Sequence, residues 1–137
     1  QVLQPEYNLY HRSAFEGALC DLCVSREIGV VTYYSLASGF LTGKYRQQSD
    51  LAQSQRGSRI GKYLNPRGLR IIDTLDEVAE QNGAKPAEVA LAWLMTREGV
   101  TAPIASATSI AQVESFARAA ALSLSAEQLA RLDTASA

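Results

Sequence analysis

The sequence predicts an α/β fold built on a parallel sheet. The strongest observation is the unbroken, β-branched run Gly29-Val30-Val31-Thr32-Tyr33, which is typical of a parallel strand covered on both faces. Shorter strands are expected at residues 2–9 and 102–107, with helical patterns between the three. Strand, helix and strand in this order indicate right-handed crossovers. Three parallel strands leave two unpaired edges, so we expect them to be part of a larger sheet or barrel.

The first two helices are predicted from capping residues and from apolar positions at helical spacing. The first is expected over residues 14–27, with Ser13 as its N-cap. The apolar side chains on one side of it are Phe15, Leu19, Leu22 and Cys23. The second is expected over residues 66–82, and Asn82-Gly83 ends it. Between them, residues 46–67 are polar and rich in Gln, Ser, Gly and Arg, which predicts a long loop of functional importance.

Three further helices have clear start signals. Pro86 opens the segment P-A-E-V-A-L-A-W-L-M at the first helical position, which proline tolerates. Ser109 is the expected cap of a helix over residues 110–121. Ser125 and Gln128 have the spacing of a capping box at the start of the last helix. We find no internal repeat and no linker, so the sequence predicts one domain segment.

Composition excludes several classes of protein. The chain has 137 residues, 47% of them hydrophobic, and a formal net charge of −1. This argues against a disordered chain and against a nucleic-acid partner, and no apolar run is long enough for a membrane span. The first residues, Q-V-L-Q-P-E-Y, do not resemble a signal peptide and contain no initiator Met. We therefore expect a piece of something longer.

Cys20 and Cys23 form a C-x-x-C motif, which occurs in redox pairs and in half of a zinc site. Here the motif falls inside a predicted helix among apolar residues, and no second cysteine pair exists. A redox pair would stand at a helix N-terminus, where the thiolate is stabilised. We interpret both residues as small core hydrophobes, and two unpaired thiols fit a reducing cytoplasm.

Polar and aromatic residues gather where each predicted strand ends, which is the edge that forms the site in α/β proteins. The residues at the three strand ends are Gln4, Glu6, Tyr7 and Asn8; then Tyr33, Tyr34, Ser35 and Ser38; then Ser106, Thr108 and Ser109. The second group could stack a ring on a flat heterocycle, with bare backbone for a pyrophosphate and Lys44 for charge. The alternative interpretation of this second group is an ordinary turn whose aromatic side chains belong to the core. The third could bind an anion at a helix start, or be ordinary capping by Ser109.

Three motifs in this order resemble the aldo-keto reductases: Q-P-E-Y-N-L-Y-H-R, Y-Y-S-L-A-S-G-F-L-T-G-K-Y and P-I-A-S-A-T-S-I-A-Q-V-E-S-F. The branch it resembles is that of bacterial members similar to potassium-channel β-subunits. The resemblance implies a (β/α)8 barrel that holds NADP(H) across its C-terminal mouth. Residues 1–137 would be the C-terminal segment of that single domain, with strands six to eight, their helices and the C-terminal helix.

The resemblance also implies a role for each site residue. Tyr33 would stack on the nicotinamide, and Gln4 would bind its carboxamide. Arg56 would bind the 2′-phosphate, with Arg59 or Lys62 as the next candidates. The pyrophosphate would lie against Tyr34, Ser35, Leu36, Ala37, Ser38 and Gly39, with Lys44 reaching it. Thr108 and Gln112 would lie near the adenosine phosphate and ribose.

The sequence departs from the family pattern at several positions. Ser35 replaces a proline, and Ser115 and Phe116 replace the Glu and Asn that would touch adenine. The catalytic Asp, Tyr, Lys and His of the family would lie upstream of residue 1, and His11 is interpreted as a loop histidine. The implied function is reduction of aldehydes or ketones, with this chain binding the cofactor and the upstream half supplying the proton donor. The alternatives are a non-catalytic NADPH-binding subunit for regulation or interaction, and an inactive structural fragment.

Overall fold

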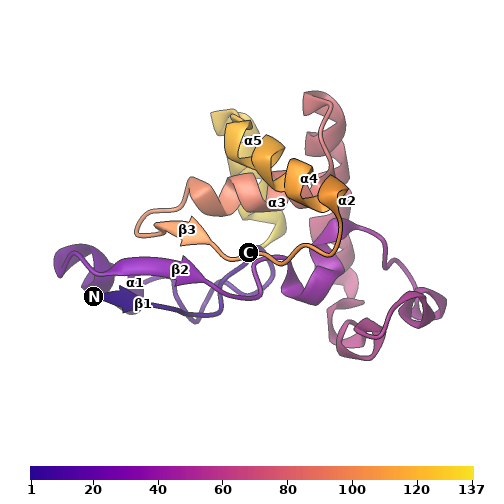
Figure 1. Cartoon of the computed structure of the whole chain (residues 1–137), viewed down its shortest axis with the longest axis horizontal. Helices are drawn as coiled ribbons and strands as arrows, with labels where there is room; N and C mark the ends of the chain where they lie inside the picture. The colour runs from indigo at the N-terminus through magenta and orange to yellow at the C-terminus, as the bar shows by residue number, and fades with distance from the viewer.

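A computed structural model describes residues 1–137 and shows a three-stranded parallel sheet in the order β1-β2-β3 (Figure 1). The strands are β1 (Val2–Leu3), β2 (Gly29–Thr32) and β3 (Ala102–Pro103). Val2 pairs with Gly29, and Val31 pairs with Ala102. The parallel α/β prediction is confirmed, with the strand of residues 29–32 at the centre.

The two outer strands are shorter than predicted. The expected strands over residues 2–9 and 102–107 end after Leu3 and Pro103, although one isolated bridge, Glu6 to Tyr33, continues the first pairing. Proline at positions 5 and 103 has no N–H to donate to a sheet ladder. The chain therefore leaves regular pairing early and carries its next residues into loops at the strand ends.

Five helices complete the chain: α1 (Ala18–Ser25), α2 (Pro66–Asn82), α3 (Pro86–Met95), α4 (Ile110–Ala121) and α5 (Ala126–Ala135). All but the first begin where the sequence predicts. The expected helix over residues 14–27 is wrong at its start, because Gly17 has φ of 89° and no side chain caps the helix. Leu22 is exposed rather than on the buried side.

Residues 37–63 form short 3₁₀ turns and not one open loop. They are η1 (Ala37–Thr42), η2 (Gln48–Gln53), η3 (Gly57–Arg59) and η4 (Gly61–Tyr63). Ile60 and Tyr63 are buried, and the Tyr63 ring stacks on Phe40 with 5.2 Å between ring centroids. The segment is the magenta loop at the right of Figure 1, and these apolar anchors attach it to the core.

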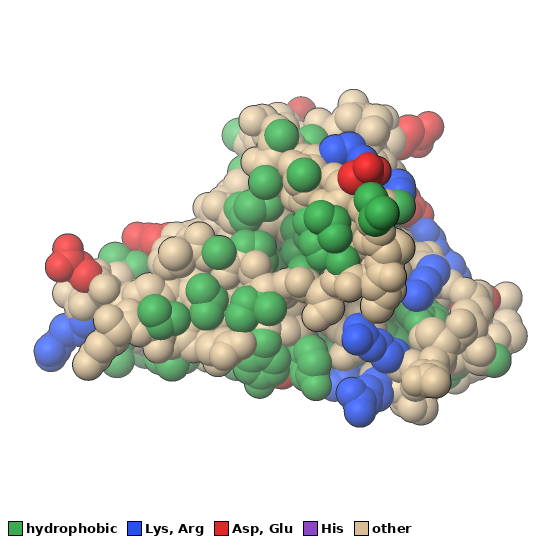
Figure 2. Space-filling view, in the orientation of Figure 1, with side chains coloured by type: hydrophobic (Ala, Val, Ile, Leu, Met, Phe, Trp, Pro, Cys, Tyr) green, Lys and Arg blue, Asp and Glu red, His purple; other side chains and the backbone are tan.

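The two faces of the sheet have different surroundings. Val30 and Thr32 are fully buried on the helical side. On the other face Val2 is 69% exposed and Ile104 is also exposed, and Figure 2 shows apolar side chains across this surface. The sheet also has two free edges, because β1 and β3 each pair only with β2. An apolar face and open edges are expected where further strands would pack.

Polar contacts lock the helices together behind the sheet. The buried Glu88 of α3 accepts hydrogen bonds from Ser115 Oγ at 2.7 Å and Arg118 Nε at 2.9 Å, both in α4. Trp93 Nε1 donates to Asp133 of α5 at 2.8 Å. Cys23 is buried and Cys20 partly buried, both as free thiols, in agreement with their interpretation as core residues.

Candidate functional site

The strand register brings the first two predicted groups to one edge of the sheet. Leu3 pairs with Val30 and Glu6 with Tyr33, so Gln4 lies beside Val31 on the uncovered face. Tyr33 is the next residue of the central strand after Val31 that points to that face, and Ile104 of the third strand lies level with it. Gln4 and Tyr33 are both exposed. The register therefore places an amide and an aromatic ring next to each other at the carboxyl ends of the strands.

Two tyrosine rings project at the end of β2. Tyr33 is 37% exposed and Tyr34 is 49% exposed, and their ring centroids lie 5.1 Å apart in an edge-to-face arrangement. Asn8 fixes the turn from the neighbouring strand end, because its Nδ2 donates to the Tyr34 carbonyl at 2.9 Å. Within residues 1–137 both rings are exposed rather than in the core.

The segment after Tyr33 has a strained backbone. Tyr34, Ala37 and Ser38 have φ between 50° and 59°, in the left-handed region that residues with a Cβ seldom adopt, and Gly39 has φ of 103°. Each such residue costs about 1 kcal/mol or more. Strain of this kind persists where the surrounding structure fixes it, and it is common at ligand sites.

The same turn presents unpaired backbone donors. The N–H groups of Tyr34, Ser35 and Leu36 make no hydrogen bond within the chain. Ser35 is a buried residue, so an unpaired donor there is costly unless a ligand accepts from it. Successive free N–H groups in a turn form a concavity that attracts anions. The expected contact of residues 34–39 with a pyrophosphate stays a prediction.

Ser35, which stands where the family pattern has proline, connects two strand ends. Its hydroxyl donates to the Ile104 carbonyl at 2.7 Å and lies 3.0 Å from the Thr32 hydroxyl. A proline ring could make neither contact. The serine therefore ties the end of β2 to the end of β3 and holds the start of the strained turn in place.

A hollow of about 350 Å³ lies between the turn of residues 34–39 and the later 3₁₀ turns η3 and η4. Its lining residues are Tyr34, Ser38, Ser58, Arg59 and Lys62. Figure 2 shows basic side chains gathered on this side of the molecule. The sequence indicated Arg59 and Lys62 only as second candidates and did not indicate Ser58. Their approach to Tyr34 depends on the fold of η3 and η4, which no local pattern reveals.

The other two predicted cations do not line this hollow. Arg56 is exposed, and its backbone N–H donates to Ser54 Oγ at 3.3 Å. Lys44 is exposed, with its Nζ 5.1 Å from the centre of the Tyr45 ring. Neither side chain takes part in an ion pair within the chain, so both are free to meet an anion.

The third strand end is capped from within the chain. Ser109 Oγ accepts from Gln112 N at 3.3 Å, which confirms the capping interpretation of Ser109. The Gln112 side-chain oxygen accepts from the Thr108 N–H at 2.6 Å and faces its hydroxyl at 3.2 Å. Thr108 and Gln112 are exposed, and a ligand that bound them would have to compete with these mutual contacts.

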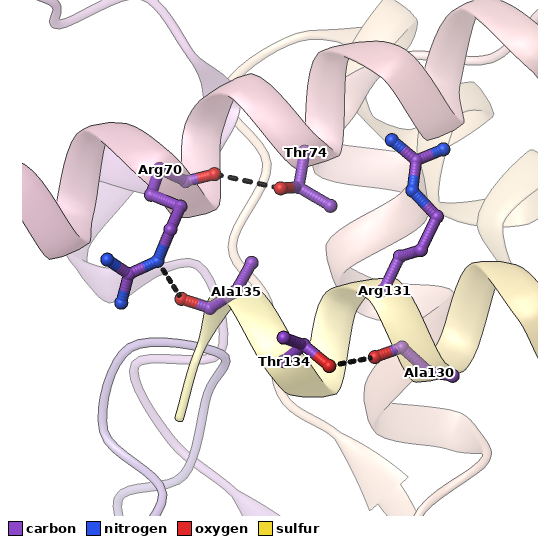
Figure 3. Close-up of a pocket in the computed structure, with 6 residues that line it drawn as sticks. All are labelled: Arg70, Thr74, Ala130, Arg131, Thr134 and Ala135. Atoms are coloured by element: carbon purple, nitrogen blue, oxygen red, sulfur yellow. Dashed lines mark hydrogen bonds between the residues drawn. The ribbon is translucent and has the colours of Figure 1, made fainter.

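Other features of the chain lie away from the carboxyl ends of the strands. A groove of about 310 Å³ between α2 and α5 is lined by Arg70, Thr74, Ala130, Arg131, Thr134 and Ala135 (Figure 3). Its threonine hydroxyls donate to carbonyls of their own helices. His11 lies 3.2 Å from Glu6 in the loop after β1. No His, Cys, Asp or Glu side chains cluster as a metal site would need, and none of the helices has the length and apolarity to cross a membrane.

A parallel α/β sheet with exposed rings, free N–H groups and cations at its strand ends has the features of a nucleotide site. Comparison with known proteins identifies the class: the Aldo/keto reductase family profile matches residues 1–137, and the chain belongs to this family. The resemblance inferred from the three motifs is thus confirmed.

Individual relatives have different names. The chain is 33% identical to an L-glyceraldehyde 3-phosphate reductase of Escherichia coli O157:H7, over 96% of this chain and 40% of that protein. It is 33% identical to a probable voltage-gated potassium channel subunit beta of Arabidopsis thaliana, over 82% of this chain and 36% of that protein. It is 38% identical to an uncharacterized oxidoreductase of Mycobacterium bovis, over 90% of this chain and 38% of that protein. The chain spans about 40% of the length of these relatives.

Proposed function

We propose that this chain is the C-terminal segment, strands six to eight, of one (β/α)8 barrel domain that reduces aldehydes and ketones to alcohols with NADP(H). The apolar uncovered face and the two open sheet edges support this, because they fit the packing of five further strands. The complete protein is then this chain joined to that upstream half. Its free thiols suit the cytoplasm.

The observation that carries the proposal is the arrangement around Tyr33. An exposed ring at a strand end lies beside Gln4, and a turn with free N–H donors follows it directly. In this proposal Tyr33 stacks on the nicotinamide, Gln4 binds the carboxamide and residues 34–39 bind the pyrophosphate. Lys44 and Arg56 supply positive charge, and Thr108 and Gln112 lie towards the adenosine.

The chemistry divides between the two halves of the barrel. The cofactor, when bound, supplies the hydride that adds to the carbonyl carbon. This chain orients the nicotinamide, and the upstream half donates the proton to the carbonyl oxygen.

A titration of the complete protein tests the proposal. Quenching of protein fluorescence should report saturable NADPH binding, and the absorbance of reduced nicotinamide should fall when an aldehyde is added. If no dinucleotide binds, the proposed function is wrong.

The second candidate is a non-catalytic NADPH-binding subunit, favoured by the likeness to a protein named as a channel subunit. In that case NADPH would bind, but none of a panel of aldehydes and ketones would consume it.

A further inference from the structure

The hollow between the strained turn and the 3₁₀ segment has a strongly positive lining. Arg59 comes from η3 and Lys62 from η4, whereas Tyr34 and Ser38 come from the turn. The stretch of residues 51–64 contains three cations and no Asp or Glu. Neither Arg59 nor Lys62 takes part in an ion pair within the chain. Two cations without an acidic partner thus line the loop side of a cavity of about 350 Å³.

The opposite wall of this hollow belongs to the turn that offers hydrogen-bond donors. Of the residues that line the hollow, Tyr34 and Ser38 belong to this turn: the Tyr34 N–H has no partner in the chain, and Ser38 adds a hydroxyl. Ser58 adds a second hydroxyl from η3. Two cations and a hydroxyl on the loop side, with an N–H and a hydroxyl on the turn side, suit a phosphate, whose oxygens are hydrogen-bond acceptors. No acidic side chain lines the hollow, so nothing there opposes an anion.

The position of the hollow decides which phosphate it suits. Tyr34 follows Tyr33 directly, and in the proposed function Tyr33 lies against the nicotinamide. In a nicotinamide dinucleotide the pyrophosphate follows the nicotinamide ribose, whereas the 2′-phosphate lies on the adenosine at the far end. A cation beside Tyr34 therefore meets the pyrophosphate first. Arg56 does not line the hollow and stays available for the more distant 2′-phosphate.

We infer that Arg59 and Lys62 bind the pyrophosphate, the charged group that NADH and NADPH share, and close over it from the loop side. This rests on the proposed function and adds two ligand-binding residues to it. The loop is anchored for this role, because Ile60 and Tyr63, which alternate with the cationic positions, are buried. Lys62 is also positioned by its neighbour, with its Nζ 5.0 Å from the centre of the Tyr63 ring.

The experiment measures dissociation constants of NADPH and NADH for the complete protein and its Arg59→Ala and Lys62→Ala variants. Both side chains are exposed, so the fold should survive. Each variant should bind both cofactors about tenfold more weakly, with an unchanged ratio between them, as expected for a lost charge-assisted contact. Arg26→Ala, an exposed arginine beyond α1, is the matched control and should change neither constant.

Three outcomes would overturn the inference. Weaker NADPH binding with unchanged NADH binding would show that these residues contact the 2′-phosphate instead. Wild-type binding that both variants retain would show that the hollow lies outside the cofactor site, while the proposed function stands. A wild-type protein that binds neither cofactor would overturn the proposed function, and this inference with it.

Discussion

Gly68 provides a test of how the fold positions the loop of residues 51–64, which contains Arg59 and Lys62. It lies in the first turn of α2, where its N–H donates to the Asn65 side chain at 2.9 Å. A Cβ built there would lie 1.8 Å from the Tyr63 carbonyl oxygen and 3.2 Å from Phe40 Cζ. Real Cβ contacts are seldom shorter than 3.0 Å, so helix and loop would have to separate by 3.0 − 1.8 = 1.2 Å or more.

We expect Gly68→Ala to lower the free energy of unfolding of the complete protein by about 1–3 kcal/mol, the usual cost of overpacking. Tyr63 lies directly after Lys62, so the same shift displaces the cation from its hollow. NADPH and NADH should therefore bind several-fold more weakly, by equal factors. Urea unfolding and cofactor titration of the same sample measure the two effects.

Gly83→Ala at the other end of α2 is the matched control. Gly83 has φ of 59° and no atom within 4 Å of an added Cβ. That variant should lose about 1 kcal/mol from backbone strain alone and should keep wild-type cofactor binding. If Gly68→Ala leaves both stability and binding at the wild-type level, the close approach of loop and helix is incorrect.

Three further predictions concern specificity and stability. Arg56→Ala should weaken NADPH binding about ten- to a hundredfold and leave NADH nearly unchanged, and an equal loss of both would exclude Arg56 as the 2′-phosphate residue. Glu88→Gln should lower the free energy of unfolding in urea by about 2 kcal/mol, because the buried side chain loses its charge and with it the charge-assisted bonds from Arg118 and Ser115. The control Glu80→Gln, at an exposed position, should change it little. Stability should also fall in acid: burial opposes ionisation of Glu88 and Glu16, yet hydrogen bonds hold the pKa of each below its ordinary value. Their contribution is therefore complete near neutral pH and is lost as pH falls through the folded-state pKa, and Glu88→Gln should show a smaller acid-induced loss than wild type.

Much of the fold could be predicted because its signals are local. Helices α2 and α4 have the predicted bounds, since Pro66, Gly83 and Ser109 mark their ends within a few residues of sequence. The start of α1 could not be predicted, because Gly17 adopts a positive φ that its neighbours do not indicate. The early ends of the outer strands do have a local signal, because Pro5 and Pro103 have no N–H to donate to a sheet ladder.

The site was predictable in outline and less so in its contacts. Small residues after an apolar strand indicated the turn at Tyr34, and the register places Gln4 beside Val31 on the same face as Tyr33. The positions of Arg59 and Lys62 beside that turn depend on how buried Ile60 and Tyr63 fold the 3₁₀ segment back. Such long-range placement leaves no periodic pattern in the sequence.

The most direct test of the account is the affinity of the complete protein for NADPH when Tyr33 is replaced. Tyr33→Ala removes the exposed ring at the end of β2 and should weaken binding by about 1–3 kcal/mol, or roughly five- to 150-fold. Tyr33→Phe keeps the ring and should bind nearly as the wild type does. A folded Tyr33→Ala protein with unchanged NADPH affinity would contradict the placement of the nicotinamide at this strand end.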